Sequence, residues 1–225
     1  MSAVKRFFVK SIGEEPCLEG EEFEHAKNVL RLSVGDEVIL LDNSGKEYSA
    51  VIVAVEKRRM RLNVLKENEG DREAATEVAL LFGYLKNADK NEFIVQKAVE
   101  LGVKKLERLN KVSREAAKQC LRSVAPEVAY CGDLKSALSA VKEYKNKLFA
   151  CEFAAESEAD ISSLSGSTAL VVGSEGGFSR EEEASAKEFG FASVTLGKRI
   201  LRAETAAVAL TAVTMFALGE LGGKA

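Results

Sequence analysis

Two glycine-containing segments in the last third of the chain combine residue types that could bind a ligand. Residues 173–179 read Gly-Ser-Glu-Gly-Gly-Phe-Ser and follow an apolar run, and residues 196–206 read Leu-Gly-Lys-Arg-Ile-Leu-Arg-Ala-Glu-Thr-Ala. Glycines let the backbone approach a ligand closely. If both segments follow strands, they form one crevice, because ligands of α/β sheets bind beyond the carboxyl ends of the strands.

The charges of the first segment limit what this crevice could hold. Glu175 lies in the loop, and three consecutive glutamates occupy residues 181–183 in the first turn of the next predicted helix. They oppose a phosphate, although a helix N-terminus alone favours an anion. The glycine spacing matches neither the dinucleotide fingerprint nor the P-loop. The pattern favours a neutral or cationic ligand held by backbone groups, and the alternative is an ordinary βαβ turn with surface glutamates.

Regular elements should position both segments. Ser179 and Glu182 have the spacing of a capping box, which predicts a helix that begins there and ends at Gly190. Residues 168–173 and 191–196 read as the strands that precede the two loops. From Ala203 to Leu218 the chain reads as a helix that is apolar nearly all round, which must be buried.

The rest of the chain divides into a β-rich part and an α/β part. The β-rich part has predicted strands at 37–42, 47–56 and 59–64 and a turn at 43–45, and such strands pack as a small barrel. A charged break at 67–76 indicates a domain boundary. Beyond it, a strand at 77–84, a helix at 90–101 and a strand at 147–153 alternate, which predicts a parallel sheet.

One region breaks this alternation. A strand should follow the helix that ends at Gly102, but residues 106–121 read directly as a second amphipathic helix. A βαβ unit cannot lose its strand and keep its register. We therefore expect that a segment of about twenty to thirty residues is missing near residues 103–107, from the usual length of a βα unit with its loop.

Composition excludes several classes of protein. With 225 residues and a net charge of −3, one or two domains are expected, and any contact with nucleic acid must come from local basic patches. The four cysteines are scattered and the single histidine is His25, so no metal site is predicted. The first residues lack a signal-peptide pattern, and the last helix is too short and interrupted to cross a bilayer. These features predict a cytoplasmic protein that does not enter a membrane.

The two glycine-containing motifs resemble those of the SPOUT-class RNA methyltransferases, and most closely the ribosomal RNA small subunit methyltransferase E family. Residues 6–9 and 25–32 resemble the N-terminal barrel of that family, and residues 86–103 resemble the start of its catalytic domain. The resemblance implies an α/β protein with an RNA-binding, PUA-like β-barrel at residues 1–70. It also implies a trefoil-knotted, parallel-sheet methyltransferase domain at residues 77–225. Ser174 departs from the pattern, because the family usually has proline there.

The resemblance implies S-adenosyl-L-methionine as cofactor and methylation of uridine N3 in 16S ribosomal RNA. Glu175 is tolerable near the sulfonium and ammonium groups of this cofactor, and Thr205 could either donate to it or cap the last helix. The candidate cofactor-binding residues are Leu170, Val172, Gly173, Glu175, Gly176, Gly177, Leu196, Gly197, Ile200, Leu201 and Thr205.

Two charged residues are candidates for the chemistry. Uracil N3 carries a proton, so the reaction requires removal of that proton or stabilisation of the anion. Arg202 could stabilise the developing negative charge, or it could form an ion pair with Glu204 or Glu175. Glu204 could act as a base, although its place in the first turn of the last helix favours an anchoring role.

The partners implied are 16S ribosomal RNA or the small ribosomal subunit, and a second copy of the chain. Candidates for positioning RNA phosphates, or else solvated surface charges, are Arg6, Arg31, Lys46, Lys86 and Lys90. The apolar last helix, like the resemblance, predicts a homodimer formed through the C-terminal domain. Two other functions stay open, namely ribose 2′-O-methylation and a non-catalytic role in RNA binding or ribosome assembly.

Overall fold

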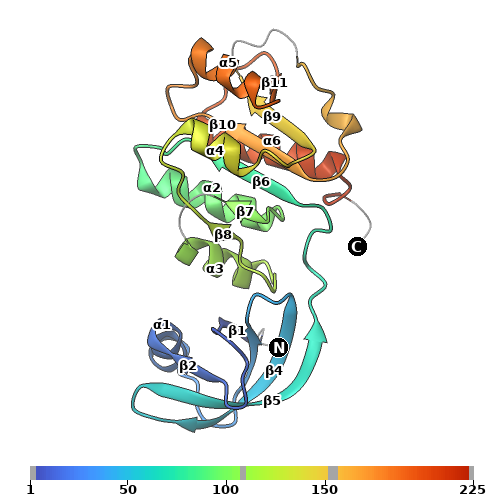
Figure 1. Ribbon diagram of the computed structural model, residues 1–225. Coiled ribbons are helices and arrows are strands. Elements are labelled where there is room, and N and C mark those ends of the chain that lie inside the picture. Colours follow the sequence, from blue (N-terminus) through green and yellow to red (C-terminus); the bar gives the residue numbers. More distant parts are fainter. Residues whose placement is uncertain (1–3, 107–109, 152–156, 223–225) are drawn as a thin grey trace. The chain divides into compact units, whose positions relative to one another are not determined.

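The computed structural model describes residues 4–106, 110–151 and 157–222 (Figure 1). The chain forms two compact units. The first comprises Met1–Glu73 together with Ala117–Ala125, and the second comprises Ala74–Ala116 together with Pro126–Ala225. A short segment from the middle of the chain is therefore part of the N-terminal unit, which no feature of the sequence indicated.

The first unit is built on a five-stranded sheet with the order β1-β3-β4-β5-β2. β1 runs parallel to β3 and the other pairs are antiparallel. The core lies between this sheet and a short helix, α1 (Gly20–Glu24), which continues as the π-helical turn η1 (His25–Val29). Its strands are β1 (Lys5–Phe8), β2 (Cys17–Glu19), β3 (Glu37–Leu41), β4 (Lys46–Val55) and β5 (Arg59–Glu69).

The predicted turn and strands of this unit are present, but one strand is longer than expected. Asn43 and Gly45 have left-handed backbones, with φ of 63° and 90°. β5 extends to Glu69, so the first residues of the predicted break pair with β4. Cross-strand contacts explain the difference, because Lys46 lies 2.5 Å from Glu67 in an ion pair between the two strands.

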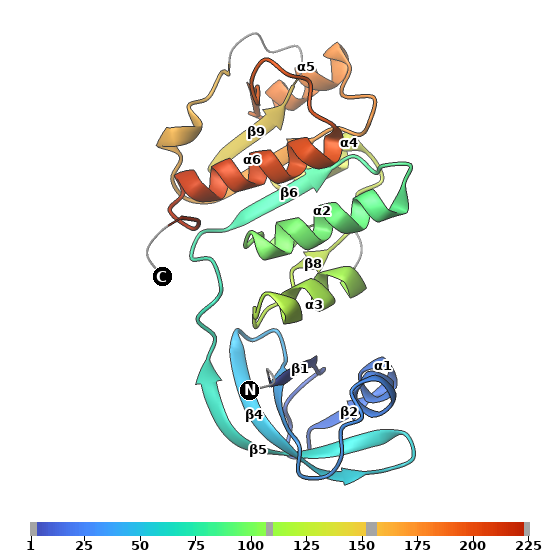
Figure 2. The ribbon, with the colours of Figure 1, turned by 180° about the vertical axis from the view of Figure 1, so that it is seen from behind.

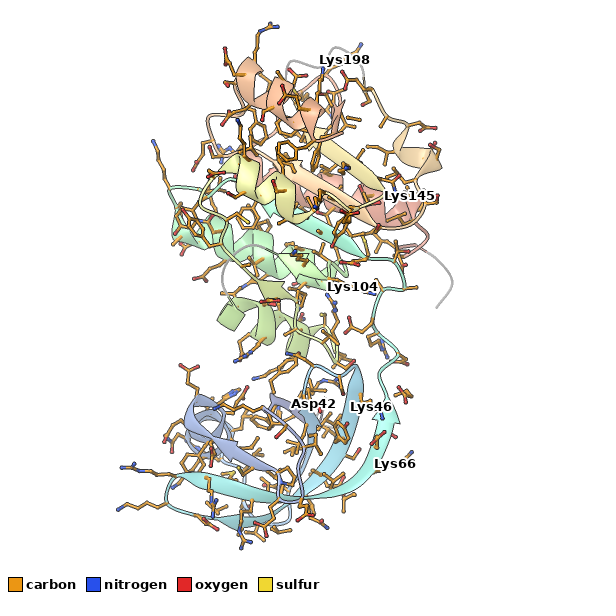
Figure 3. The ribbon with its side chains drawn as sticks, in the orientation of Figure 1. Asp42, Lys46, Lys66, Lys104, Lys145 and Lys198 are labelled. Atoms are coloured by element: carbon orange, nitrogen blue, oxygen red, sulfur yellow. The ribbon has the colours of Figure 1, made fainter. Side chains whose placement is uncertain are left out.

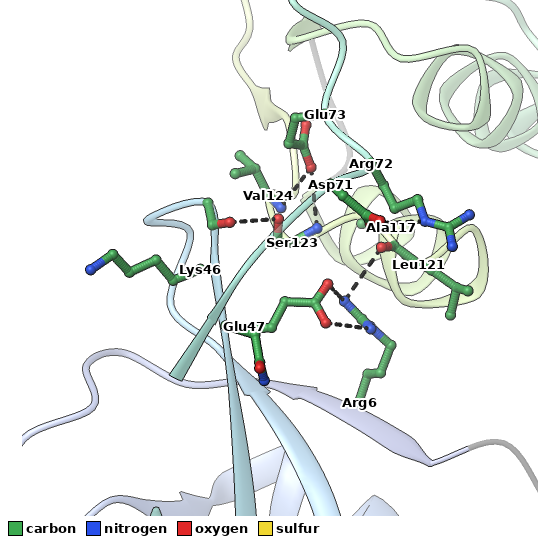
Figure 4. A network of polar contacts seen from close by, with 12 residues as sticks. Arg6, Lys46, Glu47, Asp71, Arg72, Glu73, Ala117, Leu121, Ser123 and Val124 are labelled. Atoms are coloured by element: carbon green, nitrogen blue, oxygen red, sulfur yellow. Dashed lines mark hydrogen bonds and ion pairs between the residues drawn. The ribbon is translucent and has the colours of Figure 1, made fainter. Parts of the chain in front are cut away.

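The segment Ala117–Ala125 is fixed within the first unit by Glu73 (Figure 4). The Glu73 carboxylate accepts hydrogen bonds from the backbone N–H groups of Ser123 and Val124, at 3.1 and 3.0 Å. The guanidinium of Arg122, whose side chain is 3% exposed, pairs with the same carboxylate at 2.6 Å. Backbone donors and a buried cation thus converge on one carboxylate, which we call the Glu73 network.

Contacts to the turn at 43–45 complete the attachment of this segment. The Ser123 hydroxyl donates to the carbonyl of Gly45 at 3.0 Å, and the backbone N–H of Ala125 donates to Asn43 Oδ1 at 2.9 Å. The left-handed conformation at Asn43 and Gly45 therefore shapes a turn whose oxygen atoms accept hydrogen bonds from the segment Ala117–Ala125.

The second unit is built on a six-stranded parallel sheet with the order β11-β9-β10-β6-β7-β8. Its strands are β6 (Val78–Phe82), β7 (Lys105–Leu106), β8 (Glu127–Val128), β9 (Asn146–Ala150), β10 (Thr168–Val172) and β11 (Ala192–Val194). Its helices are α2 (Ala88–Glu100), α3 (Asn110–Gln119), α4 (Leu134–Ala140), α5 (Arg180–Glu188) and α6 (Ala203–Ala217), with the short turn η2 (Ile161–Ser163). The boundary between the two units falls within α3, after Ala116.

Helices cover both faces of this sheet. Figure 1 shows α4 and α5 on one face, and Figure 2 shows α2 and α6 on the other. Ala79, Ala169 and Val171 of β6 and β10 belong to the core that includes Leu138 of α4 and Ala186 of α5. The predicted capping box is confirmed, since Ser179 caps α5 and Glu182 reaches back to its backbone N–H.

The prediction of an uninterrupted helix at 106–121 was wrong. A two-residue strand, β7, precedes α3 and pairs in parallel with β6 and β8. The sheet therefore keeps its strand at this point, because backbone pairing with neighbours on both sides outweighs the helical pattern of the sequence. Residues 107–109 lie outside the described residues, and the missing segment near residues 103–107 stays a prediction.

Candidate functional site

A cavity of about 460 Å³ lies within the second unit, at the carboxyl ends of β9, β10 and β11. β9 pairs with β10 on one side and with β11 on the other, so the loops after the three strands leave from the same edge of the sheet. The wall comprises Lys90, residues 150–151, 173–175, 177–178 and 194–204, and Ala206. The two segments that the sequence singled out thus form one crevice, as predicted.

The first loop is a tight turn closed on itself. The N–H of Gly177 donates to the Ser174 carbonyl at 3.0 Å, and Gly177 has a φ of 66°. A Cβ at Gly173 would lie 3.1 Å from the carbonyl carbon of Gly177. A side chain at residue 173 would therefore crowd the turn, and Gly173 also lines the cavity. Gly176 is exposed and does not line the cavity.

The second loop presents open backbone and apolar side chains to the cavity. Gly197 has a φ of 103°, and a Cβ built there would meet no atom within 4 Å. Leu196 and Leu201 are half-buried in the wall, whereas Ile200 is 85% exposed at its rim. This loop therefore offers a slot with backbone groups on one side and hydrocarbon on the other.

An ion pair joins α2 to α6 at the cavity wall. Lys90 Nζ lies 2.9 Å from Glu204 Oε1, and the Glu204 side chain is only 15% exposed. The hydrogen bond from Lys90 holds the pKa of Glu204 below its ordinary value, so the carboxylate is ionised at neutral pH. The other oxygen, Oε2, is buried and accepts no hydrogen bond among the described residues.

Two further contacts fix the surroundings of this pair. The Glu175 carboxylate accepts a hydrogen bond from the backbone N–H of Lys86 at 3.1 Å, which joins the first loop to the start of α2. The buried Asn91 side chain accepts from the backbone N–H of Leu85 at 2.9 Å and donates to the Leu85 carbonyl at 2.8 Å. The loop that leads to Lys90 is therefore held in one conformation.

Arg202 and Thr205 lie at the start of α6. Arg202 is the N-cap residue of the helix, its side chain is exposed, and it lines the cavity. The ion pair of Glu204 is formed with Lys90 rather than with Arg202. Thr205 lies inside the first turn, is exposed, and neither caps the helix nor lines the cavity.

Two other candidates lie away from the cavity. Leu170 and Val172 are buried within β10, because the ligand-facing positions of a parallel strand come after its last residue. Val172 instead lines a second, smaller cavity. Ten candidates do line the main cavity, namely Lys90, Gly173, Glu175, Gly177, Leu196, Gly197, Ile200, Leu201, Arg202 and Glu204.

The basic candidates for RNA contact differ in their surroundings. The Arg6 side chain is 7% exposed and pairs with Glu47 at 2.5 Å within the first unit, so its guanidinium faces a carboxylate rather than open solvent. Arg31 and Lys86 are exposed. Lys46 extends from β4 (Figure 3). It forms an ion pair with Glu67 of β5.

Sequence reasoning missed several wall residues that contribute apolar surface, among them Phe178 and Cys151. Phe178 stacks against Phe149 with ring centroids 4.2 Å apart, and Cys151 follows the end of β9. Phe178 stands next to the glycines of the first loop, so its position in the motif could have identified it. Cys151 carries no such signal, because it joins the site only through the pairing of β9 with β10 and β11.

Comparison with known proteins gives the class of protein first. Residues 72–215 match the RNA methyltransferase domain family, and residues 18–65 match the RNA methyltransferase PUA domain family. The fold is thus that of an α/β RNA methyltransferase whose parallel-sheet domain follows an N-terminal PUA-like domain.

Among the described residues, no helix is long and apolar enough to cross a membrane. Nor does any cluster of three or more potential ligand side chains in the described part suit a metal ion.

Two relatives of known name narrow this class of protein. The ribosomal RNA small subunit methyltransferase E of Bacillus subtilis is 30% identical over 248 aligned positions, covering 94% of this chain and 96% of the relative. That of Mesomycoplasma hyopneumoniae is 32% identical over 170 positions, covering 67% and 74%. The chain belongs to the ribosomal RNA small subunit methyltransferase E family. The Bacillus alignment is longer than this 225-residue chain, so that relative contains residues with no counterpart here.

Solved structures agree with this assignment. The ribosomal RNA small subunit methyltransferase E of Neisseria gonorrhoeae, bound to S-adenosyl methionine, superposes with a TM-score of 0.85 at 30% identity. That match covers 96% of this chain and 98% of the other. A Legionella pneumophila protein in complex with the same cofactor has a TM-score of 0.85 at 25% identity, covering 95% and 98%.

Proposed function

We propose that the protein transfers a methyl group from S-adenosyl-L-methionine to N3 of a uridine in 16S ribosomal RNA of the small subunit, in the cytoplasm. One observation carries the proposal: the two family motifs fold into a single cavity at the carboxyl edge of a parallel sheet. The Neisseria relative, with the same fold, was solved with this cofactor bound.

The chemistry of the cavity suits this cofactor. Its volume of about 460 Å³ lies within the range of roughly 300–1,000 Å³ for small-molecule sites. Leu196, Leu201 and the open backbone at Gly197 would receive the adenine. The buried Glu204 Oε2, which lacks a hydrogen-bond partner among the described residues, and the exposed Glu175 would favour a ligand that carries positive charge. When bound, the cofactor supplies an electrophilic methyl group.

The two charged residues Arg202 and Glu204 of the cavity wall would have different roles in methyl transfer. Arg202 would stabilise the negative charge that develops on the uracil as N3 loses its proton, because a preorganised cation lowers the barrier for such a step. Glu204 is held ionised by Lys90, and a carboxylate with a lowered pKa is a weak base. Glu204 therefore anchors the start of α6 and leaves the N3 proton to another acceptor.

RNA binding and assembly extend the proposal beyond the cavity. The PUA-like barrel at residues 1–70 would bind RNA, with Arg31 and Lys46 contacting its phosphates. In the methyltransferase domain at 77–225, Lys86 would contact a further phosphate. The latter domain would contain the trefoil knot of its class.

α6 buries only one face, and Val213 and Phe216 are 42% and 66% exposed on the other. This apolar face supports a homodimer formed through the C-terminal domain.

Methylation of purified small subunits, compared with naked 16S RNA, tests the proposal when the modified nucleoside is mapped by mass spectrometry. We expect N3-methyluridine. A methyl group on the ribose would support the 2′-O-methyltransferase alternative. Absence of cofactor binding by calorimetry would instead support a non-catalytic role in RNA binding or ribosome assembly.

A further inference from the structure

A second cavity, of about 250 Å³, lies in the second unit beside the first. Its floor contains Leu81 and Val171 from the adjacent strands β6 and β10, and its rim comes from the loops after β6 and β8. Phe178 lines this cavity as well as the cofactor cavity. The two cavities therefore share one aromatic side chain at their boundary.

Two exposed tyrosines converge on this second cavity from different loops. Tyr84 follows β6 and is 51% exposed, and Tyr130 follows β8 and is 69% exposed. Exposed tyrosine rings beside an apolar floor form a surface on which a planar group can stack. Single-stranded RNA is recognised in this way, since proteins stack unpaired bases on aromatic side chains.

Lys86, a cation that could contact an RNA phosphate, lies close to Tyr84 in the sequence. The Lys86 side chain is exposed two residues after Tyr84, and its backbone N–H is fixed by Glu175 of the cofactor loop. A nucleotide whose base enters the second cavity could therefore place its phosphate near a lysine. The loop that carries Tyr84 and Lys86 is also attached to the wall of the first cavity.

We propose that the second cavity binds an unstacked base of the substrate RNA adjacent to the methylated uridine. This inference rests on the proposed function. The methylated base itself must lie in the first cavity, because transfer requires the reacting atoms to be about 3–3.5 Å apart with nothing between them. Phe178 stands between the second cavity and that reaction, so the second cavity takes a neighbouring base.

Binding of a uridine octamer across a salt series tests this inference. Tyr84→Ala and Tyr130→Ala should each weaken binding about 5- to 150-fold, the loss expected for one stacked base, with an unchanged salt slope. Tyr84→Phe and Tyr130→Phe should bind as the wild type does. Lys86→Ala should instead lower the salt slope by about one unit. Phe93→Ala, which removes a 43% exposed ring outside both cavities, is the matched control and should have no effect.

An abasic octamer separates base contacts from phosphate contacts. The tyrosine variants should bind this oligomer as the wild type does. If they bind the uridine octamer normally, or lose affinity equally for the abasic oligomer, the inference is wrong. A wild-type protein that binds both oligomers equally would also contradict it. Cofactor calorimetry and subunit methylation, run in parallel, test the proposed function separately, since the oligomer affinities do not depend on methyl transfer.

Discussion

The cofactor cavity of the second unit and the Glu73 network of the first unit are assembled in opposite ways. Most of the cavity wall comes from residues 173–206, which fold around the ends of two strands. The network joins Glu73 to Ser123, 50 residues away, and a neighbouring hydrogen bond joins Asn43 of the turn to Ala125, 82 residues away. Local motifs therefore specify the site of chemistry, whereas long-range polar contacts attach the segment Ala117–Ala125 to the rest of the N-terminal unit. A change in one region should affect ligand binding and a change in the other should affect stability.

Gly197→Val should have the largest effect, which is the loss of cofactor binding. A branched residue is strained at a φ of 103°, and its side chain would occupy the open space that faces the backbone. Calorimetry with S-adenosylmethionine measures the loss, and thermal melting shows that the strained variant is still folded at the temperature of the assay. Gly176→Ala is the matched control, because that glycine lies in open space outside the cavity wall. Normal affinity in a folded Gly197→Val protein would show that the second loop is not part of the site.

Glu73→Ala should lower the free energy of unfolding by about 2–4 kcal/mol, because the backbone N–H groups of Ser123 and Val124 and the Arg122 guanidinium lose a charged acceptor. Urea unfolding measures this change. Glu67→Ala is the control, since Glu67 and Lys46 are about half-exposed and such pairs contribute about 1 kcal/mol or less. Cofactor affinity of folded Glu73→Ala should equal that of the wild type. Equal destabilisation by both variants would contradict the importance of the network.

Arg202→Ala should lower kcat about 10²- to 10³-fold while cofactor affinity changes little, because its charge is required only as the uracil anion develops. Single-turnover methylation of small subunits, together with calorimetry, separates these effects. Arg199→Ala removes another exposed cation of the same loop and should have a much smaller effect on kcat. A larger loss from Arg199→Ala than from Arg202→Ala would reverse the assignment.

Glu204→Gln should have the smallest effect on stability among these variants, about 1–2 kcal/mol at neutral pH, as expected for one hydrogen bond to a charged group. The Glu204 pKa is lowered in the folded protein by Lys90, so the ion pair contributes fully above the unfolded value of about 4.3. The stabilisation by this ion pair is lost as the pH falls through the lowered pKa that Glu204 has in the folded protein. The difference in melting temperature between wild type and variant should therefore vanish in acid, and a constant difference across pH would contradict this role.

The sequence was informative where structure is local. The Ser179 capping box, the left-handed turn at 43–45 and the crevice between two strand-end loops all follow from residues close together in the chain. The same holds for the family, because its motifs are contiguous segments of these loops.

Contacts between distant segments could not be predicted in this way. Arg6 looked like a surface cation but is buried against Glu47, and Lys90 is paired with Glu204 at the cavity wall. Leu170 was a candidate for the pocket, yet strand pairing places it inside the sheet. In each case the partner comes from another part of the chain, and periodicity carries no information about it.

A crystal structure of the protein with S-adenosylhomocysteine, the demethylated cofactor, would show directly where the cofactor binds. We expect the ligand to occupy the larger cavity, between the loop at 173–178 and the loop at 195–202, with its positively charged amino group nearest the glutamates of the wall. A ligand bound in the smaller cavity, or outside both, would contradict this expectation.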